Sequence, residues 1–210
     1  KCMVNTKSMT VNVSAKKTYR VKNTINLDCG ESGSTLRFLM PLALGKGVPV
    51  KFVGHGRLMQ RPQTPYFNIF REKGIRFEVG EDYIILDGTL TSGSYSLAGN
   101  VSSQFITGLL FALPMLKGDS EILISGELES KGYVDLTIDI LSKFGIEISN
   151  YKYKLFRIKG GQKYKSCGEF KVEADYSQAA FFLVADAIGC NVECMNLNPK
   201  SLQGDRAILD

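Results

Sequence analysis

The stretch Asp28-Cys29-Gly30-Glu31-Ser32-Gly33-Ser34-Thr35-Leu36-Arg37-Phe38-Leu39 joins a short apolar run to a long apolar segment through a small, polar loop. Its hydroxyl side chains are good helix caps, and Gly33 lacks the side chain that would keep a ligand from the backbone. The first N–H groups of a helix have no partner within the helix and attract anions. The stretch therefore predicts an anion-friendly helix start, although one such start is a signal of low specificity.

The same order of elements recurs along the chain. Landmark pairs lie 70, 72, 71, 72 and 74 residues apart: Ser32 and Ser102, Gly54 and Gly126, Gly74 and Gly145, Gly88 and Gly160, Ser103 and Ser177. A period of this length exceeds that of a solenoid repeat and indicates a small α/β layer with its own sheet. We therefore predict an α/β fold of repeated units, each with two helices and about four strands, rather than a chance similarity of turn residues.

Apolar periodicity and turn residues place the individual elements. Strands are expected at 8–14, 25–29, 48–53, 75–79, 83–86, 95–97, 121–125, 146–149, 156–158 and 170–172, with a basic segment at 16–22 joining the first two. Helices are expected at 34–44, 64–73, from about 103 to 116, at 134–144 and at 179–188. The third unit stops before its second helix is complete, so we expect the chain to be an internal fragment.

The composition is that of a globular protein of one or two domains, with 210 residues of which 44% are hydrophobic. The apolar runs 38–44 and 105–116 are shorter than the about 20 residues that span a bilayer, so no membrane segment is expected. Five cysteines without a zinc or disulfide spacing favour a reducing cytoplasm. The net charge of +5 is spread along the chain, which favours a small anionic substrate over nucleic acid.

Each helix start should meet the loop that follows the next strand, because ligands of α/β folds usually bind at that edge of the sheet. The three expected groupings are 32–34 with Arg57 and Arg61, 102–104 with Ser130, Lys131 and Tyr133, and 175–177 with Lys200, Ser201 and Gln203. These hydroxyls, amides and arginines suit phosphate and carboxylate groups. His55 is interpreted as a turn residue, and Asp135 and Asp139 as solvated side chains. No nucleophile–base pair is apparent.

Arg61 precedes Pro62, which favours an extended backbone at position 61. A cation near a helix N-terminus is poorly placed electrostatically, so we favour a bound anion over a surface charge. Ser102 and Ser103 could act as caps alone. Gln104, just inside an otherwise apolar helix, is harder to explain as a core residue.

Five segments resemble the 3-phosphoshikimate 1-carboxyvinyltransferase (EPSP synthase) family: 31–37 (ESGSTLR), 57–62 (RLMQRP), 101–105 (VSSQF), 129–135 (ESKGYVD) and 201–205 (SLQGD). The resemblance implies two lobes of the inside-out α/β barrel type, each with three βαβαββ units. Residues 1–173 would form most of the N-terminal lobe, with units broken near 30 and 100, and 174–210 would start the second lobe. It implies transfer of the enolpyruvyl group from phosphoenolpyruvate to the 5-hydroxyl of shikimate 3-phosphate, without a metal or organic cofactor, in a cytoplasmic monomer.

The resemblance also implies roles for single residues near phosphoenolpyruvate. Gly33 would line that pocket, Arg61 would hold the anionic groups, and Gln104 would lie between both substrates. Larger residues at the matching glycine typically let the family escape the herbicide glyphosate, so a methyl group on Gly33 should crowd the pocket. Glu31 departs from the family pattern and leaves the response to glyphosate open.

The phosphate of shikimate 3-phosphate would be held by Ser102, Ser103 and Ser130, with Tyr133 near the shikimate ring. The family's proton-transfer residues match no position of this chain, so no catalytic residue or metal ligand is expected, and the chain alone should be inactive. Two alternatives stay open. One is the related transferase acting on UDP-N-acetylglucosamine, and the other is a non-catalytic phosphate-ligand-binding module.

Overall fold

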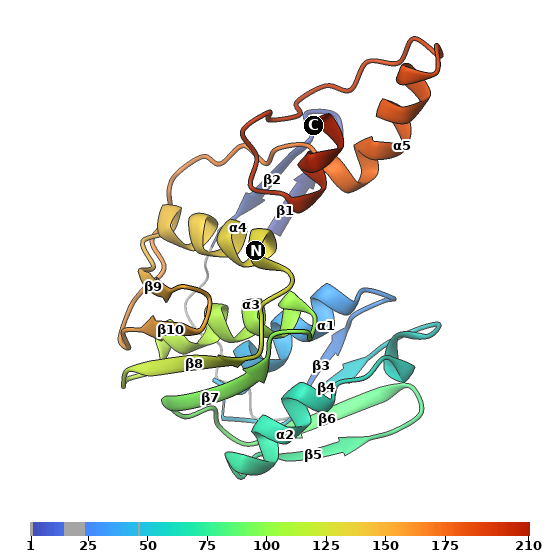
Figure 1. Ribbon diagram of the computed structural model, residues 1–210. Coiled ribbons are helices and arrows are strands. Elements are labelled where there is room, and N and C mark those ends of the chain that lie inside the picture. The colour runs from blue at the N-terminus through green and yellow to red at the C-terminus, as the bar shows by residue number, and fades with distance from the viewer. Residues whose placement is uncertain (1, 15–23, 46) are drawn as a thin grey trace.

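The computed structural model describes residues 2–14, 24–45 and 47–210 (Figure 1). Two four-stranded sheets follow one another along the chain. The first, in the order β3-β4-β6-β5, contains β3 (Ile25–Asp28), β4 (Val50–Val53), β5 (Arg76–Val79) and β6 (Tyr83–Asp87). The second, in the order β7-β8-β10-β9, contains β7 (Gly93–Ala98), β8 (Ser120–Ser125), β9 (Ile148–Tyr151) and β10 (Leu155–Ile158).

Both sheets have the same connections. The first two strands of each are parallel, with Asp28 opposite Val53 and Ala98 opposite Ser125 at their carboxyl ends. Parallel neighbours require a crossover, which the helices α1 (Gly33–Ala43) and α3 (Ser103–Ala112) supply. The helices α2 (Thr64–Glu72) and α4 (Lys131–Lys143) then lead into antiparallel hairpins. The expected α/β class and its βαβαββ repeat are confirmed in two successive units.

The core lies between the sheets and the helices, and its centre is the contact of α1 with α3 (Figure 1). Alternating residues of the strands face inward, so Phe52 in β4 and Ile122 in β8 are fully buried. On α1, Leu36 and Met40 lie one helical turn apart and are fully buried as well. This packing fixes the starts of α1 and α3 relative to each other.

Tyr66 of α2 joins these two helices through its side chain. Its buried hydroxyl lies 3.0 Å from the carbonyl oxygen of Arg37 in α1 and 2.9 Å from that of Phe105 in α3. Burial raises the pKa of this phenol well above its ordinary value. The neutral hydroxyl is therefore a donor shared between two helices of different units.

We predict that Tyr66→Phe lowers the free energy of unfolding by about 1–2 kcal/mol, because the ring still fills its place while the hydrogen bond to α1 and α3 is lost. Urea unfolding of the chain followed by circular dichroism measures the change. Tyr151→Phe, at an exposed position on β9, is the control and should shift the value by less than about 0.5 kcal/mol. Equal unfolding midpoints for wild type and Tyr66→Phe would show that the hydroxyl bridge contributes nothing.

Two expectations from the sequence are corrected. The strand expected at 8–14 is shorter and belongs to an exposed hairpin of β1 (Cys2–Asn5) with β2 (Thr10–Val13). The segment 170–172 is not a strand: it lies beside none of the described strands, and an isolated extended segment has no partner for its backbone hydrogen bonds. The basic segment expected at 16–22 lies outside the described residues. A short 3₁₀ helix that the sequence did not predict follows β4, at Leu58–Gln60. The helix expected to run to about 116 ends at Ala112 and continues as a 3₁₀ helix at Leu113–Met115.

The last part of the chain contains α5 (Tyr176–Ala187) and a 3₁₀ helix, η3 (Gly204–Leu209). These elements form an arm above α4 (Figure 1). The third expected helix start is present, because the side chain of Asp175 accepts hydrogen bonds from the backbone N–H of Ser177 and Gln178. The assignment of 1–173 to one lobe and 174–210 to the start of another stays a prediction.

None of the helices in the described part of the chain is both long and apolar enough to cross a membrane.

Candidate anion-binding site

The carboxyl edges of both sheets bring helix starts and loops together, as the sequence predicted. In the first unit, the backbone N–H of His55 donates to the carbonyl of Gly30 at 2.7 Å, which joins the loop after β4 to the loop after β3. In the second, the N–H of Glu129 donates to the carbonyl of Gly99 at 3.1 Å in the same way. Each unit therefore presents one helix N-terminus beside one polar loop.

The start of α1 is open toward the next loop. Ser32 caps the helix by accepting from the N–H of Thr35 at 3.1 Å, and Gly33 follows as the first helical residue. A Cβ atom on Gly33 would lie 3.0 Å from Nη1 of Arg61 and 3.7 Å from Oε1 of Gln104. Three residues predicted to bind phosphoenolpyruvate thus converge from three separate segments.

Arg37 also lies at this site, although its sequence pattern alone did not indicate a place there. Its Nη1 donates to Oε1 of Gln104 at 2.9 Å, and its Nη2 donates to the carbonyl of Pro62 at 3.3 Å. The guanidinium also lies 4.5 Å from the ring centroid of Phe105. Gln104 in turn donates to Oγ of Ser34 at 2.9 Å. Arg37 follows Gly33 by four residues, about one helical turn, and this spacing is the signal that could have identified it.

The site carries the positive charges of Arg37 and Arg61. Burial, followed by the nearby Arg61 charge, lowers the pKa of Arg37. Neither Arg37 nor Arg61 forms an ion pair with any residue that the structure describes. The carboxyl group of Glu31 lies instead against the turn after β4, where a Cβ atom on Gly56 would be 3.0 Å from its Cδ. A bound anion would relieve the repulsion between the two arginines.

The predicted phosphate-binding serines lie at the starts of α3 and α4. Ser102 caps α3 through a long hydrogen bond of 3.4 Å from the N–H of Gln104, and Ser103 is buried behind it. Ser130 precedes α4 without a side-chain capping bond. The two helices are joined by a hydrogen bond of 2.9 Å between the hydroxyls of Thr107 and Thr137. Three hydroxyl groups therefore lie at the starts of two packed helices, with that of Ser103 buried, and their contact with a ligand stays a prediction.

Tyr133 lies in the first turn of α4, with 41% of its surface exposed. Its hydroxyl donates to Oδ2 of Asp205 at 2.9 Å. Partial burial, and then the hydrogen bond to Asp205, raise the pKa of the phenol. The structure thus joins this predicted residue to the arm that contains α5.

The other polar residues singled out in the sequence have structural partners. Nε2 of the exposed His55 lies 3.2 Å from Oδ1 of Asp28. The N–H of Gly30, and then His55, lower the pKa of Asp28. Asp135 accepts from Tyr153 at 2.8 Å, and Asp139 pairs with Lys143 along α4 at 2.5 Å. Across 2–14, 24–45 and 47–210, no group of three His, Cys, Asp or Glu side chains could hold a metal ion.

Fold and site together define a class of protein: an α/β protein of βαβαββ units whose helix starts and arginines form an anion-binding edge. The family model of EPSP synthase (3-phosphoshikimate 1-carboxyvinyltransferase) matches residues 2–210. The chain belongs to the EPSP synthase family.

Related proteins agree with this assignment. The 3-phosphoshikimate 1-carboxyvinyltransferase of Clostridium novyi is 51% identical over 203 residues, which cover 96% of this chain and 46% of that protein. Its counterpart in Clostridium acetobutylicum is 53% identical over 192 residues, covering 90% and 45%. The solved EPSP synthase of Acinetobacter baumannii superposes with a TM-score of 0.62 at 25% identity, covering 78% of this chain and 36% of that one. The chain spans about half the length of the curated relatives it matches.

Proposed function

We propose that this chain supplies part of the active site that transfers the enolpyruvyl group of phosphoenolpyruvate to the 5-hydroxyl of shikimate 3-phosphate. One observation carries the proposal: Arg61 and Gln104 converge on Gly33 at the start of α1, and neither Arg61 nor the nearby Arg37 forms an ion pair with a residue that the structure describes. Such a site suits a small ligand with carboxylate and phosphate groups. The first N–H groups of α1 add to this attraction.

The residues divide between the two substrates. Arg61 and the start of α1 hold the anionic groups of phosphoenolpyruvate, and Gly33 leaves room for that ligand. Gln104, fixed by Arg37 and Ser34, lies between the two ligands. Both substrates would then meet within the length of one side chain, which favours the bimolecular reaction.

The shikimate 3-phosphate would bind beside this pocket, at the starts of α3 and α4. Ser102, Ser103 and Ser130 donate hydroxyl hydrogen bonds to its phosphate, and Tyr133 borders its ring. Hydroxyl and helix N–H donors match the acceptor oxygens of a phosphomonoester.

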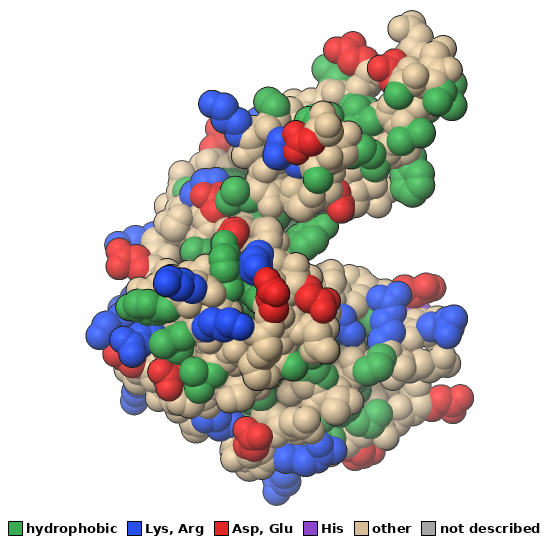
Figure 2. All heavy atoms as spheres, in the orientation of Figure 1, with side chains coloured by type: hydrophobic (Ala, Val, Ile, Leu, Met, Phe, Trp, Pro, Cys, Tyr) green, Lys and Arg blue, Asp and Glu red, His purple; other side chains and the backbone are tan. Residues whose placement is uncertain are grey.

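A second lobe would complete this site. We propose that 1–173 form most of one lobe and that 174–210 begin the next, in a cytoplasmic monomer that uses the two small substrates. The support is the arm, where α5 exposes large apolar side chains, with Phe181 78% and Ile188 76% exposed (Figure 2). Apolar surface of this kind is normally covered in a folded protein. The proton-transfer groups of the reaction would come from that lobe, so the 210-residue chain alone should not turn over.

We predict that Ser130→Ala and Ser103→Ala each weaken shikimate 3-phosphate binding by about tenfold or more, because a hydrogen bond to a charged group contributes about 1.5–3 kcal/mol. Isothermal titration of the full-length protein that carries this chain measures the loss. Ser96→Ala, exposed on β7, is the matched control and should bind as the wild type does.

Ligand titrations and a product assay separate the alternatives. Preferred binding of UDP-N-acetylglucosamine would assign the chain to that transferase instead. Binding of shikimate 3-phosphate without product formation by the full-length protein would indicate a non-catalytic module. Turnover by the purified 210-residue chain would contradict the division of the site between two lobes.

A further inference from the structure

The segment 201–205 lies directly against the first turn of α4. A Cβ atom on Gly132 would be 3.2 Å from the carbonyl oxygen of Leu202, and one on Gly204 would be 3.8 Å from Cε2 of Tyr133. The backbone of 202–204 therefore lies so close to the start of α4 that an added side chain at position 132 would meet it. The next residue, Asp205, follows directly after this close approach.

The carboxylate of Asp205 joins three elements at this point. Its Oδ2 atom accepts from the hydroxyl of Tyr133 at 2.9 Å and also from the hydroxyl of Ser177 at the start of α5. These two hydrogen bonds lower the pKa of Asp205, with the bond from Ser177 as the larger cause. The carboxylate is therefore charged near neutral pH and acts only as an acceptor.

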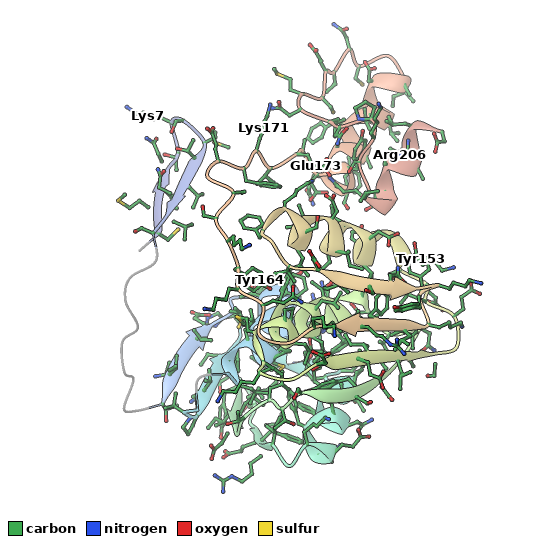
Figure 3. The ribbon with its side chains drawn as sticks, turned by 90° about the vertical axis from the view of Figure 1, so that its left-hand side faces the viewer. Lys7, Tyr153, Tyr164, Lys171, Glu173 and Arg206 are labelled. Carbon is green, nitrogen blue, oxygen red and sulfur yellow. The ribbon has the colours of Figure 1, made fainter. Side chains whose placement is uncertain are left out.

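The segment that carries Asp205 is itself held by hydrogen bonds from both sides. Gln203 accepts from the backbone N–H of Tyr176 at 2.9 Å and donates to Oε1 of Glu173 at 2.9 Å. Ser201, which is buried, donates to the same Glu173 oxygen at 2.5 Å. Figure 3 shows Glu173 at the base of the arm, where the chain leaves the layer that contains α4. These hydrogen bonds hold the segment that carries Asp205 in place.

We propose, on the basis of the proposed function, that Asp205 is a positioning residue for Tyr133 and makes its hydroxyl oxygen an acceptor toward the ligand. The single phenolic proton is donated to Asp205, so the remaining lone pairs of the oxygen can accept a hydrogen bond only from a donor group. A ring hydroxyl of shikimate 3-phosphate is such a donor, whereas a phosphate or carboxylate oxygen is not. The Tyr133–Asp205 pair would favour a ligand ring with hydroxyl groups beside Ser130 and would disfavour a second anionic group at that place.

The proposal predicts a defined pattern in the full-length protein. Asp205→Ala should raise KM for shikimate 3-phosphate about tenfold with kcat within about twofold, because ring binding is lost while the chemistry is not. Tyr133→Phe should show the same change, and the double variant should be no worse than either single one, because both act through one hydroxyl. Asp205→Asn keeps an acceptor oxygen and should recover most of the affinity. Asp210→Ala, on the same arm, is the control and should leave KM unchanged.

A ligand-free measurement separates this inference from the proposed function. Asp205 and Asp175 are the charged groups that face the phenol, and both raise its pKa, whereas a hydrogen bond from the Ser177 hydroxyl, which is present in wild type and in Asp205→Ala alike, lowers it. Ultraviolet titration of wild type and Asp205→Ala, each corrected with its Tyr133→Phe counterpart, should show a lower phenol pKa in Asp205→Ala. Two results would overturn the positioning role of Asp205. One is an equal phenol pKa in wild type and Asp205→Ala, and the other is a rise in KM in the double variant that equals the product of the rises in the two single variants. The phenol pKa could differ between wild type and Asp205→Ala while the wild-type protein binds no shikimate 3-phosphate. That result would contradict the proposed function and the ligand, but it would support the hydrogen bond between Tyr133 and Asp205.

Discussion

Arg61→Ala is expected to weaken phosphoenolpyruvate binding by about 100-fold in the full-length protein, the equivalent of about 2.7 kcal/mol. The guanidinium has no counterion among the residues that the structure describes, and its Nη1 atom faces the open start of α1. Its charge is therefore available to the ligand. Removing it takes away a charge-assisted, forked hydrogen-bond donor. Isothermal titration with phosphoenolpyruvate alone measures the loss of affinity, and the KM for phosphoenolpyruvate at saturating shikimate 3-phosphate should rise with it.

Two further variants separate charge, geometry and location. Arg61→Lys keeps the charge but loses the planar fork, so its affinity should fall about tenfold, between the wild type and alanine. Arg57→Ala removes an exposed cation from the same loop and should change the affinity by less than about threefold, because a remote exposed charge is screened by solvent. Equal losses in Arg57→Ala and Arg61→Ala would mean that only the general positive charge of the loop matters.

The helix starts could be predicted from the sequence because their determinants are local. Ser32, Ser102 and Asp175 each accept a backbone N–H within three residues of themselves, which is the capping pattern that a sequence reveals. The nearly constant spacing of such landmarks then predicted repeated units of two helices and about four strands, and the family resemblance implied the βαβαββ order. Gly33 and Arg61 could be expected to meet because parallel strands end at one edge of a sheet, whereas the place of Gln104 beside them was implied only by the family resemblance.

Other features depend on contacts between units, which local patterns do not encode. The hydrogen bond from Arg37 to Gln104 spans 67 residues and exists only because α1 lies beside α3. The Tyr133–Asp205 bond spans 72 residues and joins α4 to the arm. The segment 170–172 has a strand-like sequence but no strand beside it in the part that the structure describes. Such features follow from packing, so the sequence could supply the residues but not their partners.

Gly108→Ala is expected to lower the free energy of unfolding by about 3 kcal/mol or more, because it would overpack the α1–α3 contact. Its added methyl group would overlap the Tyr66 hydroxyl and lie 2.5 Å from the carbonyl oxygen of Arg37. Helix propensity alone predicts the opposite sign, since alanine in a helix interior is favoured over glycine by about 1 kcal/mol. Urea unfolding of the chain measures the sign of the change in the free energy of unfolding. A decrease indicates that packing dominates, and an increase indicates that helix propensity dominates.

The double variant Gly108→Ala with Tyr66→Phe tests which atom resists the methyl group. Phenylalanine removes the hydroxyl but leaves the Arg37 carbonyl in place, so the double variant should be destabilised by less than the sum of the single changes. Gly45→Ala is the control, because its Cβ would lie at an ordinary 3.5 Å from the carbonyl oxygen of Leu42.

A methyl group that pushes on the Arg37 carbonyl also displaces the residue that holds Gln104. The affinity of Gly108→Ala for phosphoenolpyruvate should therefore fall even without urea, where the variant is still folded. An unchanged affinity would show that the α1–α3 contact and the binding site are independent.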